Sequence, residues 1–249
     1  MQQTNYFVRF YRINRILLHT ITGLAIASTI WPLINQSARL KLTKWWCNGL
    51  LGHFNIALIT YGQLPPADTI STMFVANHIS WTDIHAINSV IPLRFIAKSE
   101  INNWPVFGYL VRKSGTLFIN RNQRKDALRI IEMTAQSLQH SDNVGFFPEG
   151  TTTDGSVVLS FKSSILQAAI DAGSTLWPVA IRYPLSDGSI NTKMAYAGDT
   201  SLGESMLDIL RQKNPIVELH FLTPIPTHKS DRQTLTQAAF EAISKQLNL

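Results

Sequence analysis

The residues most suited to chemistry are a histidine and an aspartate five positions apart, His78 and Asp83, in Asn-His-Ile-Ser-Trp-Thr-Asp. This loop directly follows an apolar run typical of a buried strand. Ser80 is placed to cap the helix that follows, with Asp83 in its first turn. Asp83 can then accept a hydrogen bond from one ring nitrogen, leaving the other nitrogen free as a base. The Ser-x-x-Asp spacing is also typical of a capping box, so Asp83 has an alternative, purely structural role.

Two further loops carry polar residues at the ends of apolar runs. Glu149 stands between a proline and a glycine after an apolar run, in Phe-Pro-Glu-Gly-Thr, and the alternative role is that of a turn residue. Arg121 ends the run Gly-Thr-Leu-Phe-Ile-Asn-Arg and can present a planar guanidinium group to an anion. Because Arg124 and Lys125 follow it, Arg121 is equally well interpreted as a solvated residue at a helix start.

Short apolar runs alternate with longer helical patterns after Pro65 and Pro66. The runs predict strands at 72–76, 93–97, 116–119, 144–147, 176–181 and 216–221. The helical patterns predict helices at 81–90, 122–140, 163–172, 201–212 and 232–247. This alternation predicts an α/β fold with a mostly parallel central sheet flanked by helices. In such sheets chemistry collects beyond the carboxyl ends of the strands, which is where the three loops lie.

The composition excludes several classes of protein. The 249 residues are 45% hydrophobic and 15% charged, which argues against a disordered chain. The single cysteine, Cys47, argues against a disulfide scaffold. Only one stretch approaches membrane-spanning length, which argues against a protein that crosses the membrane many times. We therefore expect a globular domain with an apolar attachment.

The net charge of +6 is confined to the beginning of the chain. Six basic residues precede the first acidic residue, Asp68: Arg9, Arg12, Arg15, Arg39, Lys41 and Lys44. They flank an apolar segment rather than forming a stripe on a folded domain, so we expect anionic lipid and not nucleic acid as the partner.

The segment 16–38 has no charged residue but is diluted by polar side chains and interrupted by Pro32. The following stretch, 40–56, combines lysine, tryptophan and leucine as interfacial helices do. We expect an N-terminal membrane-associated helical hairpin at 1–66, anchored without a full span, and an α/β domain at 67–249. Three cations on each side favour two cytoplasmic ends, on the cytoplasmic face of the inner membrane. The alternative is an ordinary pair of core helices.

The ordered motifs together resemble the glycerolipid acyltransferase family, in particular its bacterial 1-acyl-glycerol-3-phosphate acyltransferase group. They are His-x4-Asp, Gly-Thr-Leu-Phe-Ile-Asn-Arg, Phe-Pro-Glu-Gly-Thr and Trp-Pro-Val-Ala-Ile, within residues 70 to 185. The resemblance implies transfer of a fatty acyl group from an acyl thioester, acyl-CoA or acyl carrier protein, to the free hydroxyl of a lysolipid. It implies no metal and no cofactor beyond this co-substrate.

The resemblance also implies roles for individual residues. His78 would be the base and Asp83 would orient it. Arg121 would bind the anionic head group of the acceptor, and Lys98 is a candidate donor to the tetrahedral oxyanion. The residues implied in substrate binding are Asn77, Ser80, Lys98, Thr116, Arg121, Glu149, Gly150 and Thr151.

One departure bears on the acceptor. The phosphate-acceptor group continues Phe-Pro-Glu-Gly-Thr with arginine, whereas Thr152, Thr153 and Asp154 follow here. The expected acceptor is 1-acyl-glycerol-3-phosphate in phospholipid biosynthesis, and the alternative is another lysolipid such as lyso-ornithine lipid. A membrane-bound lipid esterase that uses the same His-Asp pair, a metal hydrolase built on His78, Asp83 and His85, and a non-catalytic membrane scaffold are the remaining alternatives.

Overall fold

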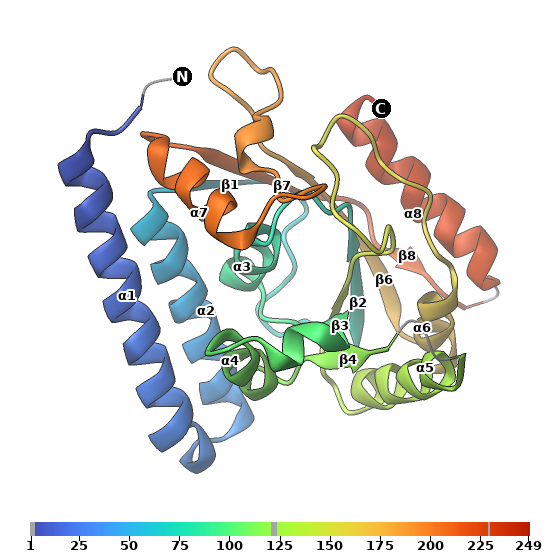
Figure 1. The fold of residues 1–249 in the computed structure, drawn as a ribbon. Coiled ribbons are helices and arrows are strands. Elements are labelled where there is room, and N and C mark those ends of the chain that lie inside the picture. The colour runs from blue at the N-terminus through green and yellow to red at the C-terminus, as the bar shows by residue number, and fades with distance from the viewer. Residues whose placement is uncertain (1–2, 121–123, 229) are drawn as a thin grey trace.

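The structure, a computed structural model, describes residues 3–120, 124–228 and 230–249 (Figure 1). Within these residues the chain forms one eight-stranded sheet with helices on both faces. The strands are β1 (Ala57–Gly62), β2 (Thr72–Ala76), β3 (Arg94–Lys98), β4 (Leu117–Ile119), β5 (Val144–Phe146), β6 (Thr175–Arg182), β7 (Ile216–Phe221) and β8 (Ile225–Pro226). The helices are α1 (Tyr6–Thr29), α2 (Gln36–Phe54), α3 (Thr82–Val90), α4 (Phe107–Lys113), α5 (Arg124–Gln139), α6 (Gln167–Asp171), α7 (Leu202–Arg211) and α8 (Arg232–Leu247).

The strand order is β1-β7-β6-β2-β5-β3-β4, with β8 paired to β6. Strands β2 to β6 run parallel to one another, whereas β7 pairs with β6 in the antiparallel direction. The predicted α/β fold with a mostly parallel sheet is therefore confirmed. Because β2, β5 and β6 are neighbours and parallel, their carboxyl ends bring the loops that follow them to one place.

The central strand β2 explains how the two faces of the sheet are filled. All five of its residues are buried, and alternate side chains point to opposite faces. Phe74 and Ala76 join a core with residues of α2, α3 and α7. Met73 and Val75 join a second core with residues of α5, α6 and α8. The sheet is thus buried on both sides, as its continuous apolar strands predict.

Three elements differ from the prediction. Strand β1 was not expected, because its residues are half-exposed at the sheet edge and follow an apolar helix without a break. The two-residue β8 and the seven-residue α4 are too short to produce a periodic pattern. The division at residue 66 stays a prediction, although β1 precedes that residue and pairs with β7 of the α/β domain.

Helices α1 and α2 pack side by side on the α/β body as a helical hairpin (Figure 1). Helix α1 ends just before Pro32, which lies in a short 3-10 turn, and Asn35 caps α2. Gly23 permits the close approach of the two helices, because a Cβ atom there would lie 2.6 Å from Nε1 of Trp46. No helix among the described residues is both long and apolar enough to cross a membrane.

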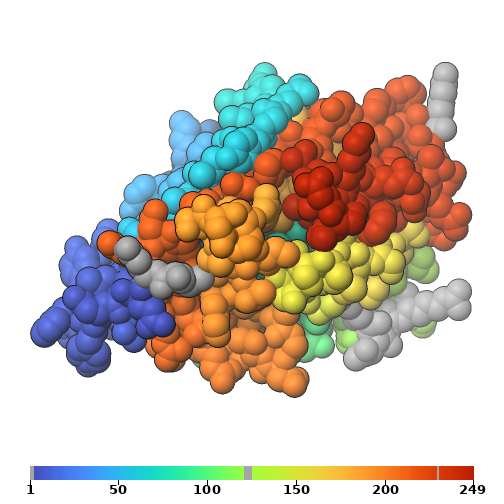
Figure 2. Space-filling view, turned by 90° about the horizontal axis from the view of Figure 1, so that it is seen from above, coloured from blue at the N-terminus to red at the C-terminus, as the bar shows by residue number. Residues whose placement is uncertain are grey.

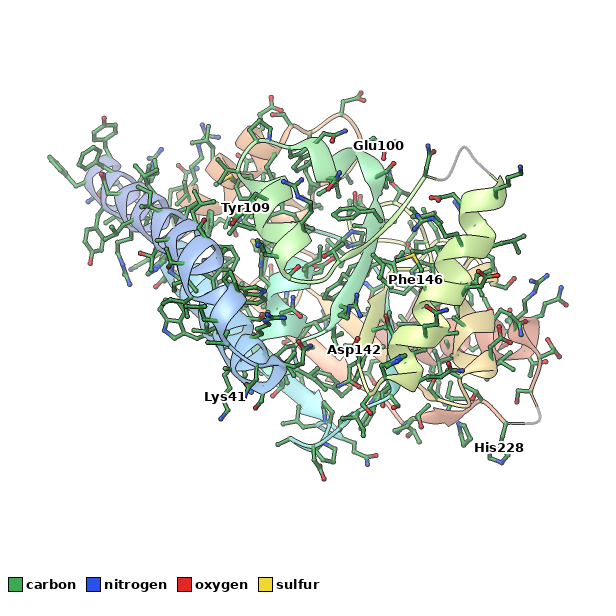
Figure 3. The ribbon with its side chains drawn as sticks, turned by 90° about the horizontal axis from the view of Figure 1, so that it is seen from below. Lys41, Glu100, Tyr109, Asp142, Phe146 and His228 are labelled. Carbon is green, nitrogen blue, oxygen red and sulfur yellow. The ribbon has the colours of Figure 1, made fainter. Side chains whose placement is uncertain are left out.

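The hairpin lies at one edge of the molecule. From above, the N-terminal end of α1 projects beyond the rest of the chain, on the side opposite α8 (Figure 2). From below, Lys41 extends away from the α/β body, and Tyr109 of α4 lies toward the hairpin (Figure 3). The Tyr109 hydroxyl lies 3.1 Å from Oγ of Ser28, so α4 is bonded to α1.

One of the six N-terminal cations is not available to a membrane surface. Arg12 is 7% exposed and lies on the inner side of α1. Its guanidinium donates to the carbonyl oxygens of Gln212 at 2.7 Å and Lys213 at 2.8 Å, and to that of Phe54 at 3.4 Å. Arg12 therefore joins α1 to the carboxyl ends of α2 and α7, where carbonyl groups lack helical partners.

We expect Arg12→Met to lower the free energy of unfolding by about 2–3 kcal/mol, because several carbonyl groups lose a charged donor. Arg15→Met is the matched control, since Arg15 is exposed on the same helix. The control should change stability by less than about 0.5 kcal/mol. Denaturant unfolding of both variants in the same detergent measures the difference, and equal stabilities would show that Arg12 does not join these elements.

Candidate active site

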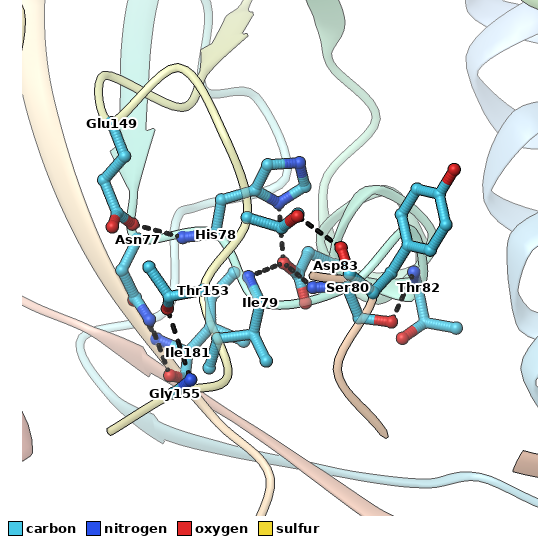
Figure 4. Close-up of polar contacts among 12 residues, drawn as sticks. Asn77, His78, Ile79, Ser80, Thr82, Asp83, Glu149, Thr153, Gly155 and Ile181 are labelled. Atoms are coloured by element: carbon cyan, nitrogen blue, oxygen red, sulfur yellow. Dashed lines mark hydrogen bonds and ion pairs between the residues drawn. The ribbon is translucent and has the colours of Figure 1, made fainter. Parts of the chain in front are cut away.

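His78 and Asp83 come together at the carboxyl end of β2. Nδ1 of His78 lies 2.8 Å from Oδ2 of Asp83, and the Asp83 side chain is fully buried (Figure 4). Because the carboxylate accepts, Nδ1 carries the proton and donates it. Nε2 has no hydrogen-bond partner among the described residues, and the imidazole side chain remains 17% exposed. The arrangement expected from the spacing is therefore present, with one ring nitrogen held and the other open.

Asp83 also holds the backbone that precedes α3. Its Oδ2 atom accepts from the backbone N–H groups of Ile79 at 2.8 Å and Ser80 at 2.9 Å. Its other oxygen, Oδ1, accepts from the hydroxyl of Tyr183 at 2.5 Å. The orienting and capping roles of Asp83 thus coexist, since one carboxylate serves the imidazole and two backbone donors.

Ser80 does not begin the helix as expected. Helix α3 starts at Thr82, with Trp81 in the capping position and no side-chain cap. Ser80 is fully buried, and its hydroxyl lies 3.4 Å from the backbone nitrogen of Thr82. Of the expected capping box the structure keeps the bond from the Ser80 N–H to the Asp83 carboxylate.

The imidazole of His78 lies flat against an aromatic ring. Its ring centroid is 3.9 Å from that of Phe147, with an angle of 7° between the planes. Phe147 in turn stacks on Phe95, with centroids 5.4 Å apart. This stack fixes the plane of the imidazole from one side, while Asp83 fixes its rotation.

Glu149 is a second buried carboxylate, 4% exposed, but its partners are backbone groups. Oε1 accepts from the N–H of His78 at 2.7 Å and Oε2 from the N–H of Leu159 at 2.8 Å. Burial raises the pKa of Glu149, and the two N–H donors oppose that rise. Glu149 therefore fastens the loop after β5 to the backbone of His78, and its role in binding substrate stays a prediction.

Asn77 is engaged in a similar way. Its side chain donates to the carbonyl of Ile181 at 3.0 Å and accepts from the N–H of Ile181 at 2.7 Å. The amide thus continues the pairing of β2 with β6 beyond the end of β2. Thr153 completes the connection, because its N–H donates to the carbonyl of His78 at 2.9 Å.

The other residues expected to bind substrate are placed differently. Gly150 has a left-handed φ of 77° in the turn after β5, and Thr151 beside it is exposed. Lys98 is exposed at the carboxyl end of β3. Thr116 directly precedes β4, which is separated from β2 by β5 and β3, and its hydroxyl lies 3.1 Å from that of Ser114. Arg121 lies outside the described residues. All these assignments stay predictions.

Two residues of the site, Tyr183 and Phe147, are not among the residues that the sequence predicts to act there. Tyr183 follows β6 directly, and Phe147 was noted only as part of a motif. Both act through contacts between residues far apart in the chain, which periodicity does not report. The position of Tyr183, just past a buried strand that neighbours β2, is the signal that would have found it.

His85 points away from the His78–Asp83 pair. Its Nδ1 lies 3.7 Å from Sγ of Cys47, and its ring packs against Trp46 and Trp81. Burial lowers the pKa of His85 to about 4. Among the described residues, no three His, Cys, Asp or Glu side chains are grouped as metal ligands would be.

Comparisons with known proteins show the family of this chain. The family model described as Acyltransferase matches residues 63–182, which include all four motifs. A relative from Neisseria gonorrhoeae, named 1-acyl-sn-glycerol-3-phosphate acyltransferase, is 37% identical over 97% of this chain and 94% of its own. A relative from Pseudomonas aeruginosa, named lyso-ornithine lipid O-acyltransferase, is 35% identical over 82% of this chain and 78% of its own.

The fold has a solved counterpart in the 1-acyl-sn-glycerophosphate acyltransferase PlsC from Thermotoga maritima. The two share a TM-score of 0.67 and 21% identity, over 95% of this chain and 96% of the other. This likeness shows the α/β fold, and the relatives show the family. The chain belongs to the acyltransferase family and is an enzyme of that class.

We expect Asp83→Asn to lower kcat by about 100-fold or more, because the amide disturbs the tautomer and the orientation of His78. The free energy of unfolding should also fall by about 1–3 kcal/mol, since the amide cannot accept all four hydrogen bonds. Asp187→Asn is the matched control, because Asp187 accepts from the N–H and hydroxyl of Ser189 in an exposed turn. Release of the thiol measures activity. An Asp83→Asn protein that loses stability but keeps its rate would show that Asp83 only caps the helix and does not orient His78.

Proposed function

We propose that this enzyme transfers a fatty acyl group from an acyl thioester to the free hydroxyl of 1-acyl-glycerol-3-phosphate in phospholipid biosynthesis. The donor is acyl-CoA or acyl carrier protein. The observation that carries the proposal is the His78–Asp83 pair, with Nδ1 held at 2.8 Å and Nε2 open at the carboxyl edge of the sheet. The membership of the chain in the acyltransferase family supports the same reaction.

The chemistry needs one base and no covalent enzyme intermediate. Nε2 of His78 takes the proton of the acceptor hydroxyl while the hydroxyl oxygen bonds to the thioester carbon. The imidazolium formed is stabilised by the Asp83 carboxylate and by the face of Phe147. The tetrahedral intermediate then expels the thiolate, which receives the proton from Nε2, so the base is regenerated and an ester is formed.

The acceptor has a second candidate, lyso-ornithine lipid. A relative that covers 82% of this chain carries that name, and the loop after the Phe-Pro-Glu-Gly-Thr motif lacks the arginine of phosphate-acceptor enzymes. Thr152 stands in its place, and Asp154 two residues further on is exposed. Oδ1 of Asp154 accepts from the hydroxyl of Ser156 at 2.6 Å and from its N–H at 2.9 Å. These bonds lower the pKa of Asp154, which adds a negative charge beside the site.

We also propose that α1 holds the enzyme on the cytoplasmic face of the membrane, where lysolipid and cytosolic thioester meet. Helix α1 has two different sides. Arg12, Ile16, His19, Gly23 and Ala27 are buried against the protein. The opposite side exposes six large apolar side chains, which we call the outer stripe: Phe7, Phe10, Tyr11, Leu17, Leu18 and Ile21.

The outer stripe has the spacing of one helix face, and each of its six side chains is more than half exposed. An exposed apolar stripe with cations nearby is typical of a helix that lies in the headgroup layer. Arg15, Lys41 and Lys44 are exposed on the hairpin and are suited to anionic lipid. The proposed partners are therefore membrane lipids, the lysolipid acceptor and the acyl donor, and not nucleic acid.

We expect purified enzyme, offered an acyl thioester and a panel of lysolipids, to form phosphatidic acid from 1-acyl-glycerol-3-phosphate. His78→Ala should lower the rate by at least about 100-fold, because a positioned base contributes roughly 10²–10⁴-fold. Mass spectrometry identifies the product, and circular dichroism checks the fold. His140→Ala is the matched control, because His140 is exposed at the end of α5. If only lyso-ornithine lipid is acylated, the acceptor is lyso-ornithine lipid and not 1-acyl-glycerol-3-phosphate. If the product is free fatty acid, the enzyme is a hydrolase and the proposed transfer is wrong.

We expect Phe7→Gln with Leu18→Gln to weaken binding to vesicles of phosphatidylethanolamine and phosphatidylglycerol by about tenfold or more, because two large apolar side chains leave the lipid. These side chains are 81% and 66% exposed. Leu128→Gln is the control, since Leu128 of α5 is 64% exposed and lies away from the hairpin. Co-sedimentation measures binding. Equal binding by the double variant and the control would contradict the role of the outer stripe.

A further inference from the structure

Tyr183 lies behind the His78–Asp83 pair and has no assigned role. It is the first residue after β6 and is 1% exposed. Its hydroxyl lies 2.5 Å from Oδ1 of Asp83 and 2.7 Å from Oγ1 of Thr82. Because a carboxylate only accepts, the phenol hydrogen points to Asp83, and the Thr82 hydroxyl donates to the phenol oxygen.

The two oxygens of Asp83 have separate partners. Oδ2 accepts from Nδ1 of His78 and from two backbone N–H groups, whereas Oδ1 accepts from Tyr183. No lysine or arginine of the described residues bonds to this fully buried carboxylate. Tyr183 is therefore the side chain, apart from His78 itself, that reduces the negative charge on Asp83.

We infer that Tyr183 is a positioning residue that sets how tightly the His78–Asp83 pair holds a proton, and this inference rests on the proposed function of His78 as base. A hydrogen bond from the phenol draws negative charge out of the carboxylate. The carboxylate then stabilises the imidazolium less strongly than it would without the phenol.

The phenol is suited to this task over the whole working pH range. Burial, the negative charge of Asp83 and the hydrogen bond to it raise the pKa of Tyr183 well above its ordinary value, so the hydroxyl keeps its proton. The titratable groups around the His78–Asp83 pair are Tyr183 at the end of β6 and Glu149 from the loop after β5. Glu149 is unchanged in every variant below, so its titration is common to all of them.

The test is Tyr183→Phe, which keeps the buried ring and removes the hydroxyl. The acid limb of the pH–kcat/KM profile should move to a pH about one unit higher, because a hydrogen bond to a charged group is lost. At pH values below both limbs kcat/KM should fall about tenfold, and the rate should recover at higher pH. A role in stability alone would lower the melting temperature and leave the limb in place.

The titration of His78 is measured separately from activity. In protein labelled with ¹⁵N-histidine, the His78 signal is assigned from its absence in His78→Asn. Its titration midpoint should move to higher pH in Tyr183→Phe, in step with the acid limb. If the enzyme acylates no lysolipid, the proposed function is wrong. If the midpoint of His78 nevertheless moves in Tyr183→Phe, the effect of Tyr183 on the His78–Asp83 pair stands.

A second variant tests the opposite direction without disturbing packing. 3-Fluorotyrosine placed at position 183 is almost the same size as tyrosine and is a stronger donor, so the midpoint and the acid limb should move to lower pH. If Tyr183→Phe does not fold, this variant alone tests whether the phenol affects the titration of the His78–Asp83 pair.

Two controls accompany these variants. Thr82→Val removes the hydrogen bond between Thr82 and the phenol but keeps the bond to Asp83, so the acid limb should stay in place even if stability falls. Tyr61→Phe removes the hydroxyl of a 44% exposed tyrosine on β1 and should leave activity unchanged. An unmoved midpoint and acid limb in folded Tyr183→Phe, or in the 3-fluorotyrosine protein, would overturn the inference.

Discussion

A carboxylate that is shielded from water must find its hydrogen-bond donors within the protein, and Asp83 finds four of them. They come from the imidazole of His78, from two backbone groups of the loop after β2, and from the end of β6. All four must be in place together, because a missing donor would leave a buried charge partly unsatisfied. This requirement fixes the loop after β2, the start of α3 and the end of β6 relative to one another.

A second buried carboxylate fixes the site from the other side. Glu149 binds the backbone of His78 and of Leu159, so the loop after β5 is fastened to the loop after β2. Phe147 of the same loop then lies flat on the imidazole. Two carboxylates after neighbouring parallel strands thus have different tasks: Asp83 serves the ring of His78, and Glu149 serves the backbone that carries it.

The regular core and the His78–Asp83 hydrogen bond could be predicted from the sequence, because both depend on residues close together in the chain. Strand β2 and helix α8 have the bounds that the pattern predicts. Tyr183 and the amide pairing of Asn77 with Ile181 could not be predicted, since each joins residues about a hundred positions apart. Arg12 shows the limit of counting charges, because a cation counted toward the membrane is buried against helix ends.

The proposed transfer of the acceptor hydroxyl's proton to Nε2 of His78 is tested most directly by a structure of the enzyme with bound lysolipid. We expect the free hydroxyl oxygen to lie about 2.6–3.2 Å from Nε2, with Nδ1 still bonded to Asp83. A well-defined lysolipid whose hydroxyl lies out of reach of Nε2, against another basic side chain, would contradict it.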